Sequence, residues 1–276
     1  MLVRVGFSAD PDDAFMFWGL ASGTVDPRGF EFEPVIEDIQ TLNEMALEAK
    51  LEVTAISLAA YPLVQDRYVL LPHGASMGAG YGPIVVARER LSLDELRREE
   101  IVIPGKLTTA YLVLKMALGG EFEARVLPFD RILPEVASGA ARVGLLIHEG
   151  QLTYRDAGLE KCLDLGEWWL LETGLPLPLG INVARRDLGL DVLRELSAVL
   201  RESIDAALAH RHEALEYALA FGRGLDDDRG DRFVGMYVNE LTRDYGEEGR
   251  EAVRELLSRA EAAGAYEPPV RVEFVE

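Results

Sequence analysis

Two short extended segments of this chain end in the same tripeptide, Val-Ala-Arg, and this pairing restricts the possible folds more than any other feature. The segments span residues 82–88 and 176–185, and both contain glycine and proline near their start. They enclose a block of about one hundred residues, which is a typical domain size. Two crossings of this kind predict two lobes joined by a hinge, with a cleft between them for a small ligand. The alternative is that both segments are ordinary strands of one sheet.

Strand-like and helix-like segments alternate before these crossings and between them, a pattern typical of βαβ units and a largely parallel sheet. The predicted strands span 2–7, 30–36, 51–56, 68–71, 84–87, 101–103, 125–127, 143–147 and 180–184, and the predicted helices span 39–50, 92–96, 108–118 and 132–137. From Asp191 onward the chain predicts only long amphipathic helices, over 192–221, 232–243 and 247–263.

This organisation fits either one doubly wound domain with a helical annex or two α/β lobes. The paired segments favour two lobes. We expect residues 1–86 and 187–276 to form lobe I and residues 87–186 to form lobe II, with the C-terminal helices bracing lobe I.

The charge and cysteine content exclude several classes of partner. With 48 acidic and 28 basic residues the formal net charge is -20, which argues against nucleic acid and anionic membranes. An anionic ligand would therefore need local donors such as helix N-termini. The single Cys162 and the absence of a zinc-like Cys or His spacing predict no metal site. No signal peptide or transmembrane run is recognisable, so we expect a cytoplasmic protein, of undetermined oligomeric state.

Polar residues follow four predicted strands, where open α/β sheets bind their ligands. After the first strand, the stretch from Ser8 to Asp13 leads into an apolar helix start. Its acids could bind a cation or a ligand hydroxyl, although N-capping by Asp12 or Asp13 is the favoured interpretation. We expect Ser8 and Asp12 to line the site. After the third strand, Ser57 could cap a helix or turn its hydroxyl toward an anion.

The other two junctions supply an anion-binding helix start and a proton acceptor. Thr108 and Thr109 follow Gly105 at a helix start, where hydroxyls and unpaired N–H groups suit a carboxylate. The apolar run 143–147 leads directly into His148, whose imidazole can take and return protons near neutral pH. A histidine at a strand end is also often a hydrogen-bonded structural residue, so a role as base depends on what faces it.

Six segments between residues 2 and 188 together carry a family pattern, namely 7–8 leading into 11–15, the junction at Ser57, and 105–111, 147–150, 164–169 and 175–180. With these segments the chain resembles the 1,4-dihydroxy-6-naphthoate synthase family of the futalosine pathway of menaquinone biosynthesis. The resemblance implies a two-lobed fold like that of the type II periplasmic binding proteins. It also implies a carbon-carbon lyase that acts on cyclic dehypoxanthinyl futalosine without metal or organic cofactor.

The resemblance further implies roles for particular residues. His148 would accept a proton, while Ser57 with its neighbours Ala55 and Ile56, and Thr109 with Ala110, would hold the substrate. A base that removes a hydroxyl proton beside the bond to be broken would allow a retro-aldol cleavage, which formation of the naphthalene ring would drive. The substrate carboxylate would rest on Ser57 or on Thr108 and Thr109.

The chain departs from the family at the first junction. The family usually has Ser-Pro-Cys-Pro-Asn-Asp-Thr-Phe there, whereas this chain has Ser-Ala-Asp-Pro-Asp-Asp-Ala-Phe over residues 8–15. The ligand roles of Asp12 and Ala14 therefore do not follow from the resemblance. Two alternative functions remain, a non-catalytic small-carboxylate binding protein and a chorismate dehydratase on the same fold. The Pro-Asp-Asp-Ala-Phe and Leu-Pro-Leu-Pro-Leu-Gly segments favour the naphthoate synthase family.

Overall fold

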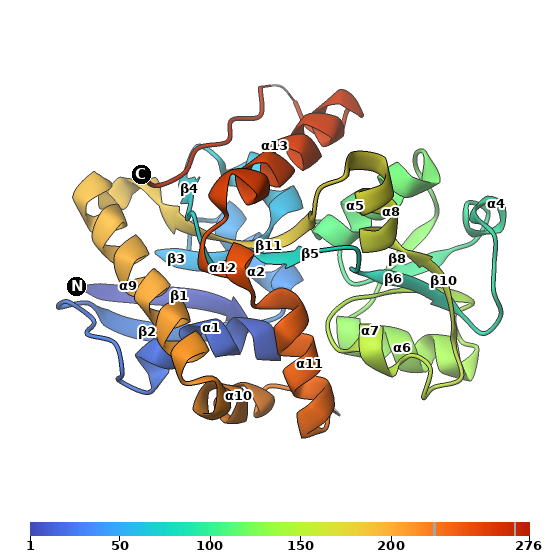
Figure 1. The fold of residues 1–276 in the computed structure, drawn as a ribbon. Helices are drawn as coiled ribbons and strands as arrows, with labels where there is room; N and C mark the ends of the chain where they lie inside the picture. The colour runs from blue at the N-terminus through green and yellow to red at the C-terminus, as the bar shows by residue number, and fades with distance from the viewer. Residues whose placement is uncertain (223–224, 268) are drawn as a thin grey trace.

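Two β-sheets form the framework of the computed structural model, which describes residues 1–222, 225–267 and 269–276 (Figure 1). The six-stranded sheet has the order β2-β1-β3-β11-β4, with β5 paired to β11. The five-stranded sheet has the order β10-β6-β9-β7-β8. The strands are β1 (Leu2–Ser8), β2 (Glu31–Glu37), β3 (Val53–Ser57), β4 (Tyr68–Leu70), β5 (Ser76–Gly78), β6 (Ile84–Ala87), β7 (Ile101–Ile103), β8 (Ala124–Val126), β9 (Val143–Leu146), β10 (Glu160–Asp164) and β11 (Leu177–Arg185).

Helices cover both sheets. Those before β11 are α1 (Pro11–Ala21), α2 (Ile39–Leu47), α3 (Tyr61–Val64), α4 (Leu93–Leu96), α5 (Thr109–Leu118), α6 (Phe129–Ser138), α7 (Gly150–Thr153) and α8 (Leu165–Thr173). Those after it are α9 (Leu190–Ala209), α10 (Arg211–Leu219), α11 (Asp227–Tyr237), α12 (Glu240–Arg243) and α13 (Gly246–Ala262). Among the described residues, no helix combines the length and the apolar character needed to cross a membrane.

The prediction of a largely parallel sheet is right only in part. β1 runs parallel to β2 and β3, and β7 runs parallel to β8 and β9. However, β6, β10 and β11 pair antiparallel with their neighbours. β6 and β11 are the paired segments recognised in the sequence, and each begins just after the chain has crossed from one sheet to the other.

The crossings between the sheets lie at residues 79–83 and 165–176, so β6 belongs to the second sheet and β11 to the first. The glycines and prolines that open the two segments therefore belong to or adjoin the crossings, and the Val-Ala-Arg ends lie inside the sheets. The proposed lobe limits at 86/87 and 186/187 remain a prediction. Residues 223, 224 and 268 of the proposed lobe I lie outside the described part of the chain.

The C-terminal helices pack against the first sheet and its helices, as predicted. α9 and α10 lie against α1, and α13 lies against β11. α9 and α1 approach closely, because the Ser203 hydroxyl donates a hydrogen bond to the Met16 carbonyl, 2.8 Å away. A Cβ atom on Gly19 would lie only 2.7 Å from Ser203 Cα, so glycine permits this approach. The contact fixes α1, whose N-terminus lies at the edge where the two sheets face each other.

Candidate active site

A cavity of about 640 Å³, partly open to solvent, lies between the two sheets. It is lined by the ends of β1, β3 and β9, by the first turns of α1 and α5, by β11, and by α11 from the C-terminal part. The strand ends and helix starts that the sequence predicts to be functional therefore meet in one place. Within this cavity lie Ser8, Asp12, Ala55, Ser57, Thr108, Thr109, Ala110 and His148, all of them predicted site residues.

Ile56 is the one predicted site residue that does not line the cavity. Successive residues of a strand point to opposite faces, so Ala55 and Ser57 face the cavity while Ile56 points away. The Ile56 side chain is 0% exposed and packs in the main hydrophobic core. The Ile56 side chain therefore points away from the cavity, because successive residues of a strand face opposite sides, and a substrate-binding role for Ile56 remains a prediction.

The start of α1 brings three buried carboxyl groups to the cavity. The helix cap is Asp10, whose Oδ1 accepts a hydrogen bond from the Asp13 N–H, and neither Asp12 nor Asp13 has the predicted capping role. Asp13 instead accepts from the Ser8 N–H at 2.7 Å, and Asp12 accepts from the Ser76 hydroxyl at 2.8 Å. The three acids are only 3, 5 and 8% exposed. These bonds leave Asp10 Oδ2 and Asp12 Oδ1 free of the helix cap and of Ser76, beside the cavity.

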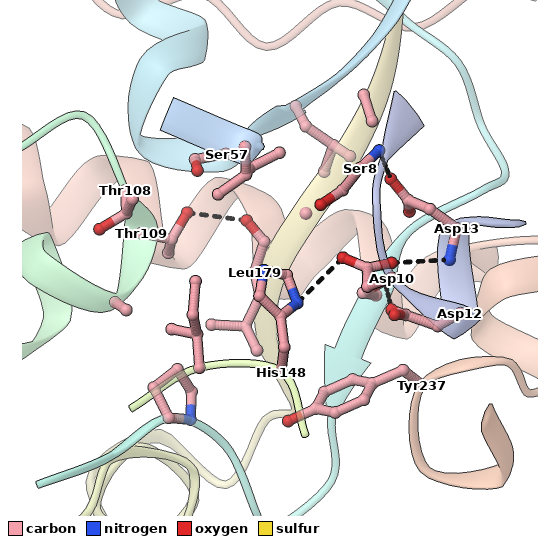
Figure 2. Close-up of a pocket in the computed structure, with 18 of the residues that line it drawn as sticks. Ser8, Asp10, Asp12, Asp13, Ser57, Thr108, Thr109, His148, Leu179 and Tyr237 are labelled. Atoms are coloured by element: carbon pink, nitrogen blue, oxygen red, sulfur yellow. Dashed lines mark hydrogen bonds and ion pairs between the residues drawn. The ribbon is translucent and has the colours of Figure 1, made fainter. Parts of the chain in front are cut away.

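His148 lies directly opposite this helix start, just beyond the end of β9 (Figure 2). Its Nδ1 is 2.9 Å from Asp10 Oδ2, and the Phe129 ring packs against the imidazole in a T-shaped arrangement with ring centroids 4.8 Å apart. The backbone of His148 has a φ of 51°, a left-handed conformation that is uncommon outside glycine. Residues held this way often serve a site. Its Nε2 is buried without a hydrogen-bond partner in the described part of the chain.

The electrostatics of this group are set by burial and by the proximity of Asp10 to His148. Burial lowers the pKa of His148, but the charge and hydrogen bond of Asp10 outweigh it, so the pKa lies above the ordinary value. Burial alone would raise the pKa of Asp10, but His148 holds it well below the usual range. Burial and the charge of Asp10 raise the pKa of Asp12 strongly and that of Asp13 to about 8. The site therefore concentrates one negative charge on Asp10.

Hydroxyl and N–H groups face these acids from the opposite side. Thr108 caps α5 by accepting from the Tyr111 N–H at 3.2 Å, and Thr109 donates to the Leu179 carbonyl at 2.7 Å. The N–H groups of Thr109 and Ala110 belong to the first helical turn, whose N–H groups have no partner within the helix. This geometry can bind an anion.

Ser57 adds a hydroxyl to the same wall of the cavity. Its side chain does not cap the short 3₁₀ helix that follows it (Leu58–Ala60), which settles the alternative left open by the sequence. Instead Asn43 holds it twice, accepting from the Ser57 N–H at 2.8 Å and donating to its hydroxyl at 3.0 Å. Because Asn43 acts as donor to the hydroxyl oxygen, the Ser57 hydroxyl proton is available to a ligand.

Sequence reasoning missed several cavity residues. Tyr237 of α11 donates a hydrogen bond to Gln151 Oε1 of α7 at 2.6 Å, and both residues line the cavity. No local pattern marks them, because only the packing of the C-terminal helices brings α11 to the cleft. Ser76 lies on β5, a strand of three residues that the sequence did not predict. Asp10 stands in the junction that the sequence singled out, but its partner is 138 positions further along the chain.

Asp10, Asp12 and His148 also have the donor types of a metal site. Each offers one ligand atom, and these atoms lie within 4.8 Å of one another. Asp10 and His148 already bind each other in this arrangement, so an ion would have to replace their direct contact. The expectation that the protein works without metal or other cofactor remains a prediction.

Comparison with known proteins places the chain among biosynthetic enzymes. A family model described as menaquinone biosynthesis matches residues 3–262. The chain is 46% identical over 274 residues to the 1,4-dihydroxy-6-naphthoate synthase of Thermus thermophilus, covering 99% of both chains. It is also 48% identical to the crystal structure of protein AF1704 from Archaeoglobus fulgidus, covering 96% of this chain and 98% of that one, with a TM-score of 0.91.

The fold itself extends to binding proteins of much lower identity. The alkanesulfonate-binding protein of Xanthomonas axonopodis, solved with MOPS, matches with a TM-score of 0.72 at 10% identity, covering 98% of this chain and 96% of that one. Such a likeness concerns the fold alone. The predicted two-lobed α/β fold of the type II periplasmic-binding-protein class is thereby confirmed.

Proposed function

This chain belongs to the menaquinone biosynthesis family, and we propose that it converts cyclic dehypoxanthinyl futalosine to 1,4-dihydroxy-6-naphthoate with His148 as general base. The enzyme is a lyase of the futalosine pathway, an activity supported by similarity over almost its whole length to a curated naphthoate synthase. The observation that carries the proposed mechanism is the meeting of an unpartnered imidazole nitrogen and a set of anion-binding donors in one cavity.

The substrate carboxylate binds on the wall formed by Ser57 and the start of α5. Among the described residues that line the cavity there is no Lys or Arg, so hydroxyl and N–H groups must supply the attraction. Thr108, Thr109 and Ala110 present the first turn of α5, where the helix dipole favours a negative charge. This arrangement answers the difficulty that a net charge of -20 poses for an anionic substrate.

His148 then acts on the part of the substrate opposite the carboxylate. Its Nε2 takes the proton of the hydroxyl beside the scissile carbon-carbon bond. The carbon-oxygen bond becomes a carbonyl, the carbon-carbon bond breaks, and the electron pair enters the ring system that becomes the naphthalene. A positioned base of this kind contributes on the order of a hundredfold or more to the rate.

Contacts across the cleft prepare the site to close around a bound substrate. The pairs of Asp10 with His148 and Tyr237 with Gln151 each join residues that lie on different sides of the cavity. When such contacts close over a bound substrate, they align the base and exclude solvent. We further propose a cytoplasmic location and a small-molecule carboxylate as the only ligand required.

The test is to incubate the purified protein with cyclic dehypoxanthinyl futalosine and, separately, with chorismate, and to follow the products by mass spectrometry. We expect naphthoate from the first substrate and no reaction with the second. Conversion of chorismate would instead indicate the dehydratase, and binding without turnover would indicate a carboxylate-binding protein.

The role of the base is tested by His148→Gln, which we expect to lower kcat about a hundredfold or more. The exposed His212 on α10 provides the matched control, since His212→Gln makes the same chemical change outside the cavity. If His148→Gln bound the substrate and turned it over at the original rate, His148 would not be the base.

A further inference from the structure

We propose that Asp10 is the positioning residue for His148, because its carboxylate accepts the Nδ1 proton and leaves the lone pair on Nε2 for the substrate. This inference rests on the proposed function, in which His148 is the base. It concerns a residue that the family resemblance does not assign, because the corresponding family pattern has no carboxylate at this position.

Geometry supports the assignment directly. The 2.9 Å between Asp10 Oδ2 and His148 Nδ1 is a normal hydrogen-bond length for a charged acceptor. A carboxylate bears no proton in its charged form, so the shared proton belongs to Nδ1. In the neutral imidazole Nε2 then carries the lone pair. That atom is buried without a partner in the part of the chain described, as a base awaiting its substrate would be.

Both residues of this pair are restrained by their surroundings. Asp10 caps α1, and its second oxygen accepts from the Asp13 N–H at 3.1 Å, so the carboxylate is fixed at both oxygens. His148 is restrained by its left-handed backbone and by the Phe129 ring. Asp10 comes from the end of β1, in the first sheet, and His148 from the end of β9, in the second. The hydrogen bond therefore also ties the two sides of the cleft together.

Several other titratable groups surround the imidazole. The adjacent Glu149 raises the pKa of His148 through its charge, and Asp13 on α1 does so once it ionises. Asp12 lies against Asp10, and Tyr237 of α11 lines the same cavity. Burial opposes ionisation of Asp12 and Asp13, which leaves Asp10 as the anion in contact with the ring. Removing that anion should weaken the base and free the ring to adopt the other tautomer.

The experiment compares Asp10→Asn and Asp10→Ser with the wild type by measuring kcat, KM and the pH profile of kcat/KM. Both replacements are good helix caps, so α1 keeps its start. We expect kcat to fall about 10- to 100-fold with little change in KM. We also expect the acid limb of kcat/KM to move down by about one pH unit, because an opposite charge in contact shifts a pKa by about this much or more.

Asp164→Asn is the matched control. Asp164 is a buried N-cap like Asp10 and accepts from the Gly166 and Glu167 N–H groups, but it caps α8 and does not line the cavity. A variant that merely loosened a helix start would lower stability in both cases and leave the acid limb in place. We expect only the Asp10 variants to move the limb.

A measurement on the unaltered enzyme completes the test. Nitrogen-15 NMR at a pH above the pKa of His148 should show a protonated Nδ1 and an unprotonated Nε2. An unmoved acid limb in the Asp10 variants, or a proton on Nε2 in the wild type, would overturn the assignment. Both outcomes are distinct from failure of the proposed function, in which His148→Gln would itself keep full activity.

Discussion

Replacing Asp13 by Asn should change how the stability of the protein depends on pH. Asp13 is 8% exposed, and burial together with the charge of Asp10 raises its pKa to about 8. In the unfolded chain the same carboxyl group ionises near the ordinary value of about 3.9. Between these two values the folded protein holds a proton that the unfolded chain has lost. Stability is therefore lost as the pH rises, until Asp13 ionises in the folded state as well.

The size of the effect follows from the two pKa values. Each pH unit below the folded pKa corresponds to about 1.4 kcal/mol of unfolding free energy. Between about pH 6 and pH 9 the wild type should thus lose about 3 kcal/mol through Asp13. An asparagine cannot ionise, and its side-chain oxygen can still accept the hydrogen bond that Ser8 donates to Asp13 Oδ2. Asp13→Asn should therefore gain about that amount over the wild type across this range.

Urea denaturation at a series of pH values, followed by circular dichroism, measures the unfolding free energies. The quantity to compare is the difference between variant and wild type at each pH, because titration of other groups cancels in it. Asp66→Asn, at a carboxylate whose side chain is 83% exposed, provides the control and should follow the wild type throughout. Parallel curves for Asp13→Asn and the wild type would mean that Asp13 is already ionised at low pH, and the argument from burial would then be refuted.

Three further substitutions test buried positions outside the cavity. Ile56→Ala should cost about 3 kcal/mol in urea denaturation, because it removes a fully buried core side chain, and a cost near zero would contradict its placement. Burial lowers the pKa of His73 to about 4, so the wild type should lose stability as the pH falls from about 6.5, and His73→Gln should lose less. A Cβ atom on Gly166 would lie 2.0 Å from the Tyr81 carbonyl oxygen, so Gly166→Ala should cost about 3 kcal/mol or prevent folding; a wild-type thermal midpoint would contradict this.

The elements that the sequence predicted well are those whose signal is local. β1 and β3 are largely apolar runs that end in a serine, and β9 is an apolar run that ends two residues before His148. In each case the apolar run and the polar residue that follows it are close in sequence, so both are visible locally. β10 was missed because its residues are largely polar and only partly buried, and β5 because its sequence, Ser-Met-Gly, lacks the β-branched and aromatic residues typical of strands. The predicted helix over 192–221 is in fact two helices that meet at His210, since α10 turns to pack against α1.

The candidate site was predictable as a set of junctions but not as a set of contacts. The strand ends and helix starts named Ser57, Thr108 and His148 correctly as cavity residues, because sheet topology brings such ends together. The sequence could not reveal that Asp10 meets His148, since the two residues follow strands of different sheets. Which acid caps α1 also depends on the backbone angles at the turn. Asp10 has the extended conformation of an N-cap, whereas Asp12 and Asp13 already belong to the helix.

Three buried acids can lie beside the binding site of an anion because only one of them is charged near neutral pH. If all three were ionised, they would repel the substrate and one another in a region of low dielectric constant. Burial keeps Asp12 and Asp13 protonated near neutral pH, and the remaining charge on Asp10 is paired with His148. The donors at the start of α5 then meet a substrate carboxylate without competition from a nearby uncompensated charge. Asp10 thus acts on the base, while the protonated Asp12 and Asp13 leave the anion site free of further negative charge.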